Sequence, residues 1–371
     1  MSNDTTKTIR IGILSTAWIN DVILDSVRRV QGVECTYIAS RDLKRAQKYA
    51  EDNDIPNACT YDELLAAPID AVYIPLPTAI APDWAVRSAK AGKHVLVDKP
   101  FASVPEVERI KGACEEAKLV FMDGTHFAHA ARTHEVRSRI VNGDIGKIKR
   151  VLAAFCYPIP KMAENIRSKP DVEPMTLWGD LGWYVSRAAV AFLGVEVASK
   201  IVSVNCSSKL FERFSNTVQS AEGIVEFQLN DGENVSLCFA VDGTASIIMR
   251  ATIIGEEGFL ELDDFVVPSR QTLIFDHIRD PKDFTVDLEY SYSKSVESIK
   301  GEDDYQWKFP TLQTVLVDEG GFPQAAKMIK EFARMIREND LESSRRWMTE
   351  TLVTQGIVDA VFEKIKEQHA F

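Results

Sequence analysis

The chain has 371 residues, with 55 Asp and Glu against 43 Lys and Arg, so its formal net charge is −12 at pH 7. At ~150 residues per domain this length indicates two domains, or at most three. The acidic balance argues against a protein that binds nucleic acid regardless of sequence. The 45% hydrophobic content argues against a disordered chain, and no apolar run reaches the ~20 residues of a membrane span.

The N-terminal stretch and the cysteines indicate a cellular compartment. Residues 1–8 (MSNDTTKT) lack the basic start and apolar core of a secretory signal. The six cysteines show no CxxC spacing, which favours free thiols in a reducing compartment over disulfides or zinc. We therefore expect a soluble, acidic, cytoplasmic protein.

The first third of the chain alternates short apolar runs with amphipathic runs. The apolar runs predict strands at 9–14, 33–40, 71–76, 95–97 and 119–122. The amphipathic runs predict helices at 21–30, 42–53, 83–91 and 105–117. Buried strands that alternate with helices form a parallel sheet covered on both faces, and right-handed crossovers make it doubly wound. We expect an α/β nucleotide-binding domain over residues 1–146.

The pattern changes after residue 146. Long β-like runs follow one another at 147–157, 195–207, 223–228, 235–241, 246–254, 259–262 and 272–275, with one helix predicted at 180–193. Asp231–Gly232 and Asp242–Gly243 are typical of hairpin turns. Two amphipathic helices, at 321–339 and 348–368, end the chain. Residues 147–371 therefore predict an α+β domain with an open, mostly antiparallel sheet, whose C-terminal helices could pack back on the first domain.

The first predicted strand leads into a candidate dinucleotide fingerprint. Its three positions read Gly12, Leu14 and Ala17, with Ser15 beside them. The fingerprint uses glycine for a tight turn and for close approach of a pyrophosphate. Because Leu14 stands where the second glycine is expected, an ordinary strand-to-helix turn explains the segment equally well.

The end of the second predicted strand indicates which dinucleotide fits. An NAD site usually has Asp or Glu there, whereas this chain has Ser40 and Arg41. A hydroxyl followed by a guanidinium would bind the 2′-phosphate of NADP(H) that a carboxylate would repel. The alternative is a solvated Arg41 that opens a helix beside Asp42.

A charged pair, Asp98 and Lys99, follows the buried strand at 95–97 and precedes Pro100. Ligands bind at the carboxyl ends of parallel strands, so Lys99 is well placed to stabilise a developing alkoxide. An ordinary surface ion pair is the alternative.

Histidines cluster in the next segment, at positions 126, 129 and 134. Their spacing fits no zinc motif and no cysteine lies near them, so we expect no metal. We expect His126, Phe127 and His129 to line a substrate pocket; the alternative is that they cap the following helix.

Together these segments resemble the glucose–fructose oxidoreductase and inositol dehydrogenase (Gfo/Idh/MocA) family of oxidoreductases. The chain resembles most the branch of dimeric dihydrodiol dehydrogenase and NADP-dependent D-xylose dehydrogenase. The segments that carry the resemblance are AGKHVLVDKP (91–100), DAVYIPLPT (70–78), FMDGTHFAHAART (121–133), NIRSKPD (165–171), GDLGWYVSRA (179–188) and GEEGFLELDDFVVP (255–268). The match spans nearly the whole chain.

The resemblance implies an N-terminal Rossmann domain and hydride transfer between NADP(H) and a secondary alcohol or carbonyl of a sugar-like or cyclic diol substrate. It implies that Tyr184 is the proton donor and acceptor, that Lys99 lowers the pKa of Tyr184, and that Asp180 holds substrate hydroxyls. A phenol has an intrinsic pKa near ~10, which a nearby ammonium brings closer to neutrality. Without the resemblance, a tyrosine beside Trp183 reads as part of a core.

The resemblance adds further contacts. It places Pro75, Leu76, Pro77 and Asp98 at the cofactor, and Arg167 and Trp183 in the substrate pocket. It also implies a homodimer formed through the open sheet of the second domain.

Three departures from the family pattern stand out. Ser15 replaces a glycine, Asp98 replaces a glutamate, and Ala81 stands where a histidine is usual. None removes Lys99 or Tyr184, so a specialised substrate is the better explanation than lost activity. The alternative is a non-catalytic, NADP-sensing regulatory or binding protein, which would not need that pair.

Overall fold

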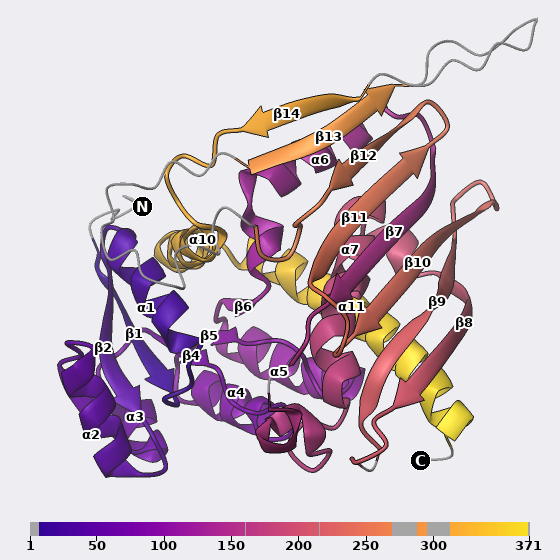
Figure 1. Ribbon diagram of the computed structural model, residues 1–371. Helices are drawn as coiled ribbons and strands as arrows, with labels where there is room; N and C mark the ends of the chain where they lie inside the picture. Colours follow the sequence, from indigo (N-terminus) through magenta and orange to yellow (C-terminus); the bar gives the residue numbers. More distant parts are fainter. Residues whose placement is uncertain (1–6, 160, 215, 269–287, 295–311, 370–371) are drawn as a thin grey trace, which may run out of the picture. The chain divides into compact units, whose positions relative to one another are not determined.

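The computed structural model describes residues 7–159, 161–214, 216–268, 288–294 and 312–369 (Figure 1). The chain forms two compact units, and each draws on more than one stretch of sequence. The first unit contains residues 1–129, 164–180 and 323–356, and the second contains residues 130–163, 181–322 and 357–371. This division differs from the single boundary expected after residue 146. Two later segments, residues 164–180 and 323–356, return to the N-terminal unit; the sequence allows such a return for the C-terminal helices but gives no sign of it for residues 164–180.

The first unit is built on a six-stranded sheet whose strands all run parallel. Its strand order, β3-β2-β1-β4-β5-β6, is that of a doubly wound dinucleotide-binding sheet. The strands are β1 (Ile9–Leu14), β2 (Val33–Ala39), β3 (Asn57–Cys59), β4 (Ala71–Ile74), β5 (His94–Val97) and β6 (Phe121–Asp123). The helices between them are α1 (Asn20–Arg29), α2 (Leu43–Asp52), α3 (Tyr61–Ala66), α4 (Ala81–Lys90) and α5 (Val104–Ala117). The expected doubly wound α/β fold is confirmed.

The hydrophobic pattern does not predict β3 and α3. With three and six residues, they are too short to show a period. A local signal does mark α3, because Thr60 and Glu63 form a capping box in which the Thr60 N–H donates to Glu63 Oε2 over 2.8 Å. The apolar side of α3 places the fully buried Leu64 against the sheet.

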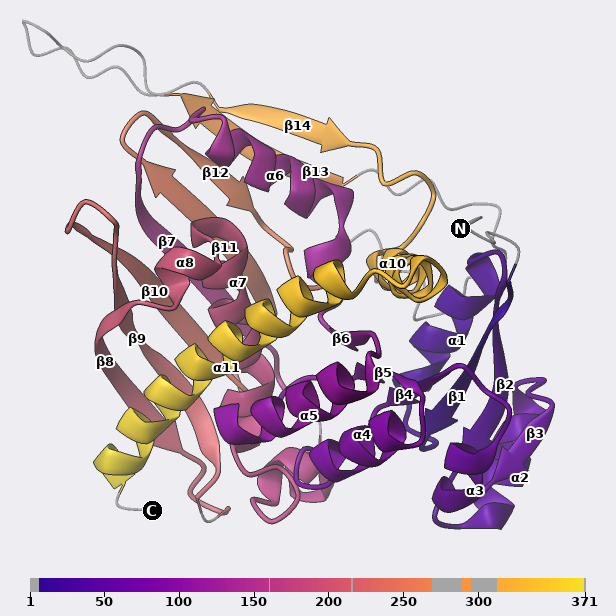
Figure 2. The same cartoon turned by 180° about the vertical axis from the view of Figure 1, so that it is seen from behind.

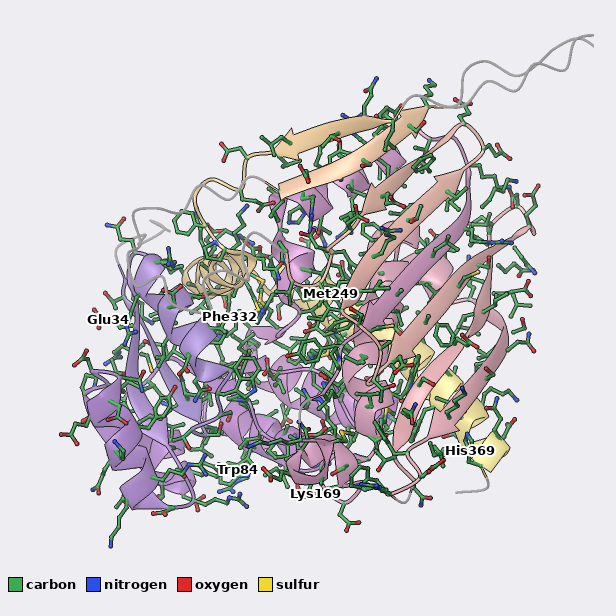
Figure 3. All side chains as sticks on the ribbon, viewed as in Figure 1. Glu34, Trp84, Lys169, Met249, Phe332 and His369 are labelled. Atoms are coloured by element: carbon green, nitrogen blue, oxygen red, sulfur yellow. The ribbon has the colours of Figure 1, made fainter. Side chains whose placement is uncertain are left out.

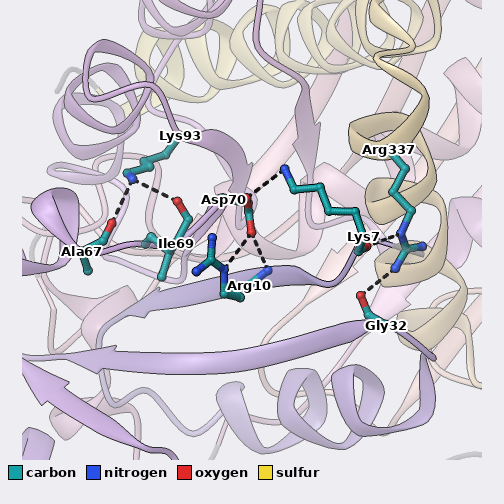
Figure 4. A network of polar contacts seen from close by, with 8 residues as sticks. All are labelled: Lys7, Arg10, Gly32, Ala67, Ile69, Asp70, Lys93 and Arg337. Carbon is teal, nitrogen blue, oxygen red and sulfur yellow. Dashed lines mark hydrogen bonds and ion pairs between the residues drawn. The ribbon is translucent and has the colours of Figure 1, made fainter. Parts of the chain in front are cut away.

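Helix α10 (Gln324–Glu338) comes from late in the chain and packs on α1. Phe332 of α10 is fully buried in the first unit (Figure 3). Near the end of α10, the Arg337 guanidinium donates to the backbone oxygens of Lys7, over 3.0 Å, and of Gly32, over 2.6 Å (Figure 4). The β1–β2 connection is therefore held by a residue 305 positions later than Gly32.

A second set of contacts in Figure 4 surrounds Asp70, just before β4. Its carboxylate accepts a hydrogen bond from Arg10 N over 2.9 Å and forms an ion pair with Lys7 Nζ at 3.1 Å. Burial alone would raise the pKa of Asp70, but these donors hold it below its ordinary value. Lys93 donates to the Ala67 carbonyl over 2.9 Å in the same region. These contacts stabilise the amino ends of the strands, away from the ligand-binding edge.

The second unit contains an eight-stranded sheet of order β14-β13-β12-β11-β7-β10-β9-β8. Its strands are β7 (Ile148–Cys156), β8 (Ile201–Leu210), β9 (Val218–Gln228), β10 (Asn234–Asp242), β11 (Ile248–Gly255), β12 (Gly258–Leu262), β13 (Leu288–Lys294) and β14 (Gln313–Val317). Every neighbouring pair is antiparallel except β7 with β10. The expected mostly antiparallel sheet is confirmed.

One predicted hairpin in this sheet is wrong. Asp231–Gly232 joins the paired strands β9 and β10, as expected. Asp242–Gly243 closes no hairpin, because β7 lies between β10 and β11 in the sheet. Strand β7, from earlier in the chain, separates β10 from β11 in the sheet, although these two are neighbours in sequence. Turn residues do not reveal such an insertion.

The predicted strand at 195–207 begins as a short helix, α8 (Val195–Ala198), and β8 starts only at Ile201. The β-branched residues Val195 and Val197 favour a strand by propensity, yet the segment is helical and buries Ala198 fully. The predicted strand at 272–275 lies outside the described residues.

The helices α6 (Ala131–Val141), α7 (Trp183–Leu193) and α8 contact the sheet of the second unit and lie on one face of it (Figure 2). In the described part of the chain no helix covers the opposite face, which is turned toward the viewer in Figure 1. On that face Ile224, Cys238 and Leu152 follow one another across three neighbouring strands. The expected open face therefore carries a strip of partly exposed apolar side chains.

Candidate active site

The turn between β1 and α1 begins after Leu14. Gly12 and Leu14, read from the sequence as fingerprint positions, lie inside β1. A Cβ at Gly12 would come within 2.7 Å of Ile69 Cδ1 and 2.8 Å of Leu64 Cδ1. Gly12 therefore makes room for the packing of α3, and the structure does not place it in a ligand-binding turn.

The fingerprint spacing fits instead at Ser15, Ala17 and Asn20, three residues further along. Ser15 opens the turn and Asn20 is the first residue of α1. The backbone N–H groups at the start of a ten-residue helix favour a phosphate at this position. The sequence signal for this register is the end of the apolar run at Leu14, since a phosphate-binding turn begins where its strand stops.

Ser15 has a φ of +138°, a backbone conformation that glycine adopts more readily than serine. Its Oγ donates to Pro75 O and accepts from Ala17 N, each over 3.2 Å. The fully buried Asn20 donates from Nδ2 to Ser15 O over 2.8 Å. Three hydrogen bonds thus hold a serine where the family pattern has glycine, and nothing in the sequence marks Asn20 as a contributor to this turn.

The carboxyl end of β2 presents the predicted selector residues. Ser40 is buried and Arg41 is exposed. The Asp42 carboxylate is used as the N-cap of α2, where it accepts from Lys44 N over 3.0 Å. This carboxylate therefore has a local role that accounts for its position beside Arg41.

A second guanidinium, that of Arg45, lies in the same region. Arg45 is in the first turn of α2, and its Nη2 is 3.5 Å from Thr16 O in the β1–α1 turn. Burial raises the pKa of the Tyr61 phenol, and the charges of Arg41 and Arg45 both oppose that rise. Both guanidiniums therefore lie close enough to the Tyr61 phenol for their charges to act on it. Position 45 gave no signal in the sequence, because arginine is common on helix surfaces.

The loop that follows β4 contains Pro75, Leu76 and Pro77, of which the first two are buried. Ser15 contacts this loop at Pro75, and Thr78 ends it. Ala81, which stands where the family has histidine, is the first residue of α4 and is buried. The loop is therefore in contact with the β1–α1 turn, as a dinucleotide-binding crevice requires.

Lys99 follows β5 and forms an ion pair with Asp180. Asp180 Oδ2 also accepts from Arg167 Nε over 2.7 Å. Burial alone would raise the pKa of Asp180, but the charges of Arg167 and Lys99 hold it well below its ordinary range. Asn165 Oδ1 accepts from Arg167 Nη1 over 3.2 Å and so orients the guanidinium. Three predicted site residues thus meet at the carboxyl end of β5.

Asp98 lies next to Lys99 and has an unusual ionisation. Burial raises the pKa of the Asp98 carboxyl to about 7, although the charge of Lys99 lowers it. A Cβ at Gly124 would come within 2.3 Å of Asp98 Oδ1, so only glycine admits the carboxylate there. The nearby Asp123 is fully buried and accepts from Thr351 Oγ1 over 2.6 Å.

The histidine segment after β6 forms the 3-10 turn η1 (His126–His129). Burial lowers the pKa of His126 to about 4, and the charge of Lys99 lowers it further, so the imidazole is neutral near pH 7. Phe127 is buried, and His129 stacks on Trp347 at a ring separation of 4.3 Å. His126 therefore lies close enough to Lys99 for the charge of the ammonium to act on its imidazole.

Asp180 and Tyr184 lie on one continuous helical segment. A π-helical turn, η4 (Trp178–Gly182), contains Asp180 and leads directly into α7. Such turns are frequent at functional sites. Tyr184 is half-buried and packs edge-to-face on Phe155 of β7, with ring centres 5.2 Å apart, whereas Trp183 is fully buried in the second unit.

The described residues contain no group of three His, Cys, Asp or Glu side chains placed to hold a metal ion. All six cysteines are free thiols. No helix in the described ranges has the length and apolarity needed to cross a bilayer.

Comparison with known proteins gives a matching family model and two informative relatives. Residues 9–125 match the model of an oxidoreductase family with an NAD-binding Rossmann fold. The D-xylose 1-dehydrogenase (NADP(+)) 2 of Haloferax volcanii is 36% identical over 186 residues, which cover 49% of this chain and 57% of that protein. A dTDP-3,4-didehydro-2,6-dideoxy-alpha-D-glucose 3-reductase of Streptomyces antibioticus is 30% identical over 233 residues, which cover 62% of this chain and 68% of that protein.

Several of the curated relatives are matched over a little more than half of their own length, as the 57% of the Haloferax protein illustrates. A solved structure agrees in fold over nearly the whole chain. The crystal structure of a 3-ketoreductase from Actinomadura kijaniata, in complex with NADP and TDP-benzene, superposes with a TM-score of 0.76 at 24% identity and covers 95% of this chain and 97% of that one. The sheet orders, the residues at the ends of β2 and β5, and these matches agree, and the chain belongs to the Gfo/Idh/MocA family of oxidoreductases with an NAD-binding Rossmann fold.

Proposed function

We propose that this chain is an NADP(H)-dependent oxidoreductase that moves a hydride between nicotinamide and a secondary alcohol or carbonyl of a sugar-like or cyclic diol substrate. The observation that carries the proposal is the ion pair of Lys99 and Asp180 at the carboxyl end of β5, the edge where open α/β sheets bind their ligands. The names of the relatives, a D-xylose dehydrogenase and a dTDP-sugar reductase, support a sugar-like substrate.

The residues at the end of β2 fit NADP(H) better than NAD(H). Ser40, Arg41 and Arg45 would hold a 2′-phosphate, because guanidinium groups bind phosphate oxygens in pairs. The β1–α1 turn at Ser15 and the N–H groups of α1 would hold the pyrophosphate. NADP(H), when bound, supplies or accepts the hydride, and the chain supplies alignment and charge.

The proton would be carried by Tyr184, whose phenol oxygen donates it to a carbonyl or accepts it from an alcohol. The ammonium of Lys99 would lower the pKa of that phenol from its intrinsic value near ~10. Asp180 keeps the Lys99 ammonium in a fixed place and, with Arg167, would hold substrate hydroxyls by charge-assisted hydrogen bonds.

Replacement of Tyr184 by phenylalanine tests this assignment. We expect Tyr184→Phe to lower kcat by on the order of 10²–10⁴-fold, the usual contribution of a positioned acid, and to leave NADPH affinity unchanged. Tyr292→Phe is the matched control, because it removes a phenol hydroxyl that donates to Asp144 O elsewhere in the second unit. An unchanged kcat in Tyr184→Phe would overturn the catalytic assignment.

A substrate survey separates the enzyme from a non-catalytic NADP sensor on the same fold. Pentoses, hexoses, anhydro-sugars and cyclic diols would each be incubated with NADP⁺, and NADPH formation followed by absorbance. We expect turnover with at least one class. Tight NADPH binding without turnover anywhere in the panel would favour the sensor.

The open sheet face of the second unit favours a homodimer. Leu152 and Ile224 are 37% and 41% exposed there, and a contiguous apolar strip on a sheet is usually covered by a partner. We expect a dimer by light scattering and a monomer for Leu152→Glu; a wild-type monomer would contradict this assignment. The six free thiols fit a reducing compartment such as the cytoplasm.

A further inference from the structure

The loop formed by residues 75–78 is attached at both of its ends to other parts of the first unit. At one end, Ser15 Oγ donates to Pro75 O over 3.2 Å. At the other end, Thr78 N donates to Glu173 Oε1 over 3.1 Å, and Thr78 Oγ1 donates to Glu173 Oε2. The loop therefore joins the β1–α1 turn to the segment around Glu173, which lies 95 residues after Thr78 in the chain.

The contact between Thr78 and Glu173 is buried. Thr78 is 3% exposed and Glu173 is 8% exposed. Alongside it, Ala79 N donates to Val172 O over 3.1 Å, so three hydrogen bonds join the two segments. A carboxylate taken out of water is costly unless its oxygens are hydrogen-bonded, and here both oxygens accept from one residue. We call these three hydrogen bonds between residues 78–79 and residues 172–173 the clasp; it is a buried, specific contact rather than a chance surface contact.

Glu173 lies between two residues of the candidate site, Arg167 and Asp180, on one hydrogen-bonded stretch. Glu173 N donates to Lys169 O over 2.9 Å, and Thr176 N donates to Glu173 O over 2.8 Å. Burial raises the pKa of the Glu173 carboxyl, and the charge of Asp180 raises it further while that of Arg167 lowers it. Displacement of Glu173 would therefore move a stretch that carries both Arg167 and Asp180.

The far end of this stretch is fixed against the residue that follows Lys99. A Cβ at Gly179 would come within 3.3 Å of Pro100 Cγ and 2.9 Å of Met175 Cβ. Gly179 N donates to Met175 O over 3.1 Å. Because Gly179 is closely packed, Asp180 has little room to move independently of its neighbours. Its position next to Lys99 therefore depends on the position of the whole stretch 167–180.

We propose that Glu173 is a positioning residue that ties the loop at 75–78 to the stretch carrying Arg167 and Asp180, so that dinucleotide binding orders the substrate-binding residues. The inference rests on the proposed function, because it takes this loop to border the bound dinucleotide. Coupling of this kind requires that both ligands favour the same arrangement of a shared element, and the loop with its clasp is that element.

Hydrogen–deuterium exchange with and without NADPH tests the proposal without any knowledge of the substrate. In the wild-type protein NADPH should slow exchange in residues 15–20 and 75–78 and also in residues 172–180. In Glu173→Ala, which removes both acceptors of Thr78, the slowing at 15–20 should persist. The slowing at 172–180 should fall from on the order of tenfold, which lies within the ordinary range of coupling, to less than about twofold. Asp171→Ala is the matched control, since Asp171 is an exposed carboxylate on the same stretch.

Substitutions at Thr78 separate positioning from simple loss of stability. Thr78→Ser keeps the hydroxyl donor and should retain the NADPH-dependent protection of residues 172–180. Thr78→Val removes the hydroxyl and should lose it. Glu173→Ala should raise the KM of whichever sugar the survey identifies and leave the Kd of NADPH unchanged, a split that a general loss of stability does not produce.

The outcomes are distinguishable. No NADPH-dependent protection at 15–20 would overturn the proposed function itself. Protection at 15–20 and 75–78 without any at 172–180 in the wild type would overturn the role of Glu173 alone. Equal protection of 172–180 in wild type and Glu173→Ala would also overturn it.

Discussion

Arg167 Nε donates to Asp180 Oδ2 over 2.7 Å, while Lys99 contacts Oδ1 of the same carboxylate. Two cations therefore share one anion whose side chain is 14% exposed. A buried carboxylate in this position keeps both cations in place as well as neutralising part of their charge. Removing it has a different consequence from removing either cation.

Asp180→Asn should destabilise the protein at pH 7 by about 3–5 kcal/mol, because it leaves two cations beside a neutral amide. The folded-state pKa of Asp180 is lowered, so its contribution is present above the unfolded value near ~3.9 and is lost as the pH falls below it. Urea unfolding of both proteins at pH 7 and at about pH 3 checks this. A stability difference that is the same at both pH values would contradict it, and the exposed Asp171→Asn should show little difference at either.

The pKa shift of Asp98 has the opposite sign to that of Asp180, because burial raises the pKa of Asp98 to about 7. Between the unfolded value near ~3.9 and about 7, the folded state holds a proton that the unfolded state has lost. The contribution of this group to stability therefore falls as the pH rises through that window, by at most about 1.4 kcal/mol per pH unit. Relative to wild type, Asp98→Asn should gain stability from about pH 4 to about pH 7 and then level off. Parallel stability–pH curves for the two proteins would rule this out.

Substitutions of Ser15 separate backbone strain from hydrogen bonding. Ser15→Ala keeps the φ of +138° and loses the bond to Pro75 O, so we expect a loss of about 1 kcal/mol. Ser15→Gly loses the same bond but relieves strain of order 1–3 kcal/mol. Denaturant unfolding should therefore rank Ser15→Gly above Ser15→Ala. The reverse order would mean that the side chain, and not the backbone, determines the conformation of the turn.

Replacing Arg41 or Arg45 should weaken the use of NADPH but not that of NADH. Each replacement by alanine should raise the KM for NADPH by about tenfold or more, the usual value of a hydrogen bond to a charged group, and leave NADH kinetics nearly unchanged. Lys48→Ala is the control, because Lys48 is an exposed cation on α2 that pairs with Asp52. Equal effects on the two cofactors would refute a 2′-phosphate site.

Gly12→Ala should affect stability more than cofactor binding. The added methyl group would press on the fully buried Leu64 and on Ile69, at a cost of about 1–3 kcal/mol. We expect a lower Tm and an unchanged Kd for NADPH in protein that remains folded. A large loss of NADPH affinity at unchanged Tm would instead indicate that Gly12 contributes to the ligand-binding turn.

The sequence predicts regular elements of the first unit closely where they are long and buried. Strand β1 spans the predicted residues, and the alternation of strands and helices is sufficient to identify the doubly wound sheet. Lys99 is predicted from its place after a buried strand, where ligands bind to open α/β sheets, and Asp180 is predicted from the resemblance of residues 179–188 to the family. The clasp between Thr78 and Glu173 leaves no trace in the sequence, since each residue alone is unremarkable and their meeting depends on how the chain returns.

The position of the dinucleotide fingerprint along the chain shows a second limit of prediction from sequence. Gly12 attracts the assignment because glycine is expected in the turn, yet its role is to admit α3 against β1. Ser15 and Asn20 perform in the turn, through hydrogen bonds, what glycine would perform through backbone freedom. Residue type alone does not distinguish these two uses of a position.

The return of α10 to the first unit has a consequence for protein synthesis. Arg337 completes the β1–β2 connection, and Phe332 fills the core beneath α10. The N-terminal sheet, although translated first, therefore lacks part of its core until the ribosome has made nearly the whole chain. A nascent chain stopped after residue 146 would expose the apolar surface that α10 later covers, so the strands made first are among the last to be fully protected.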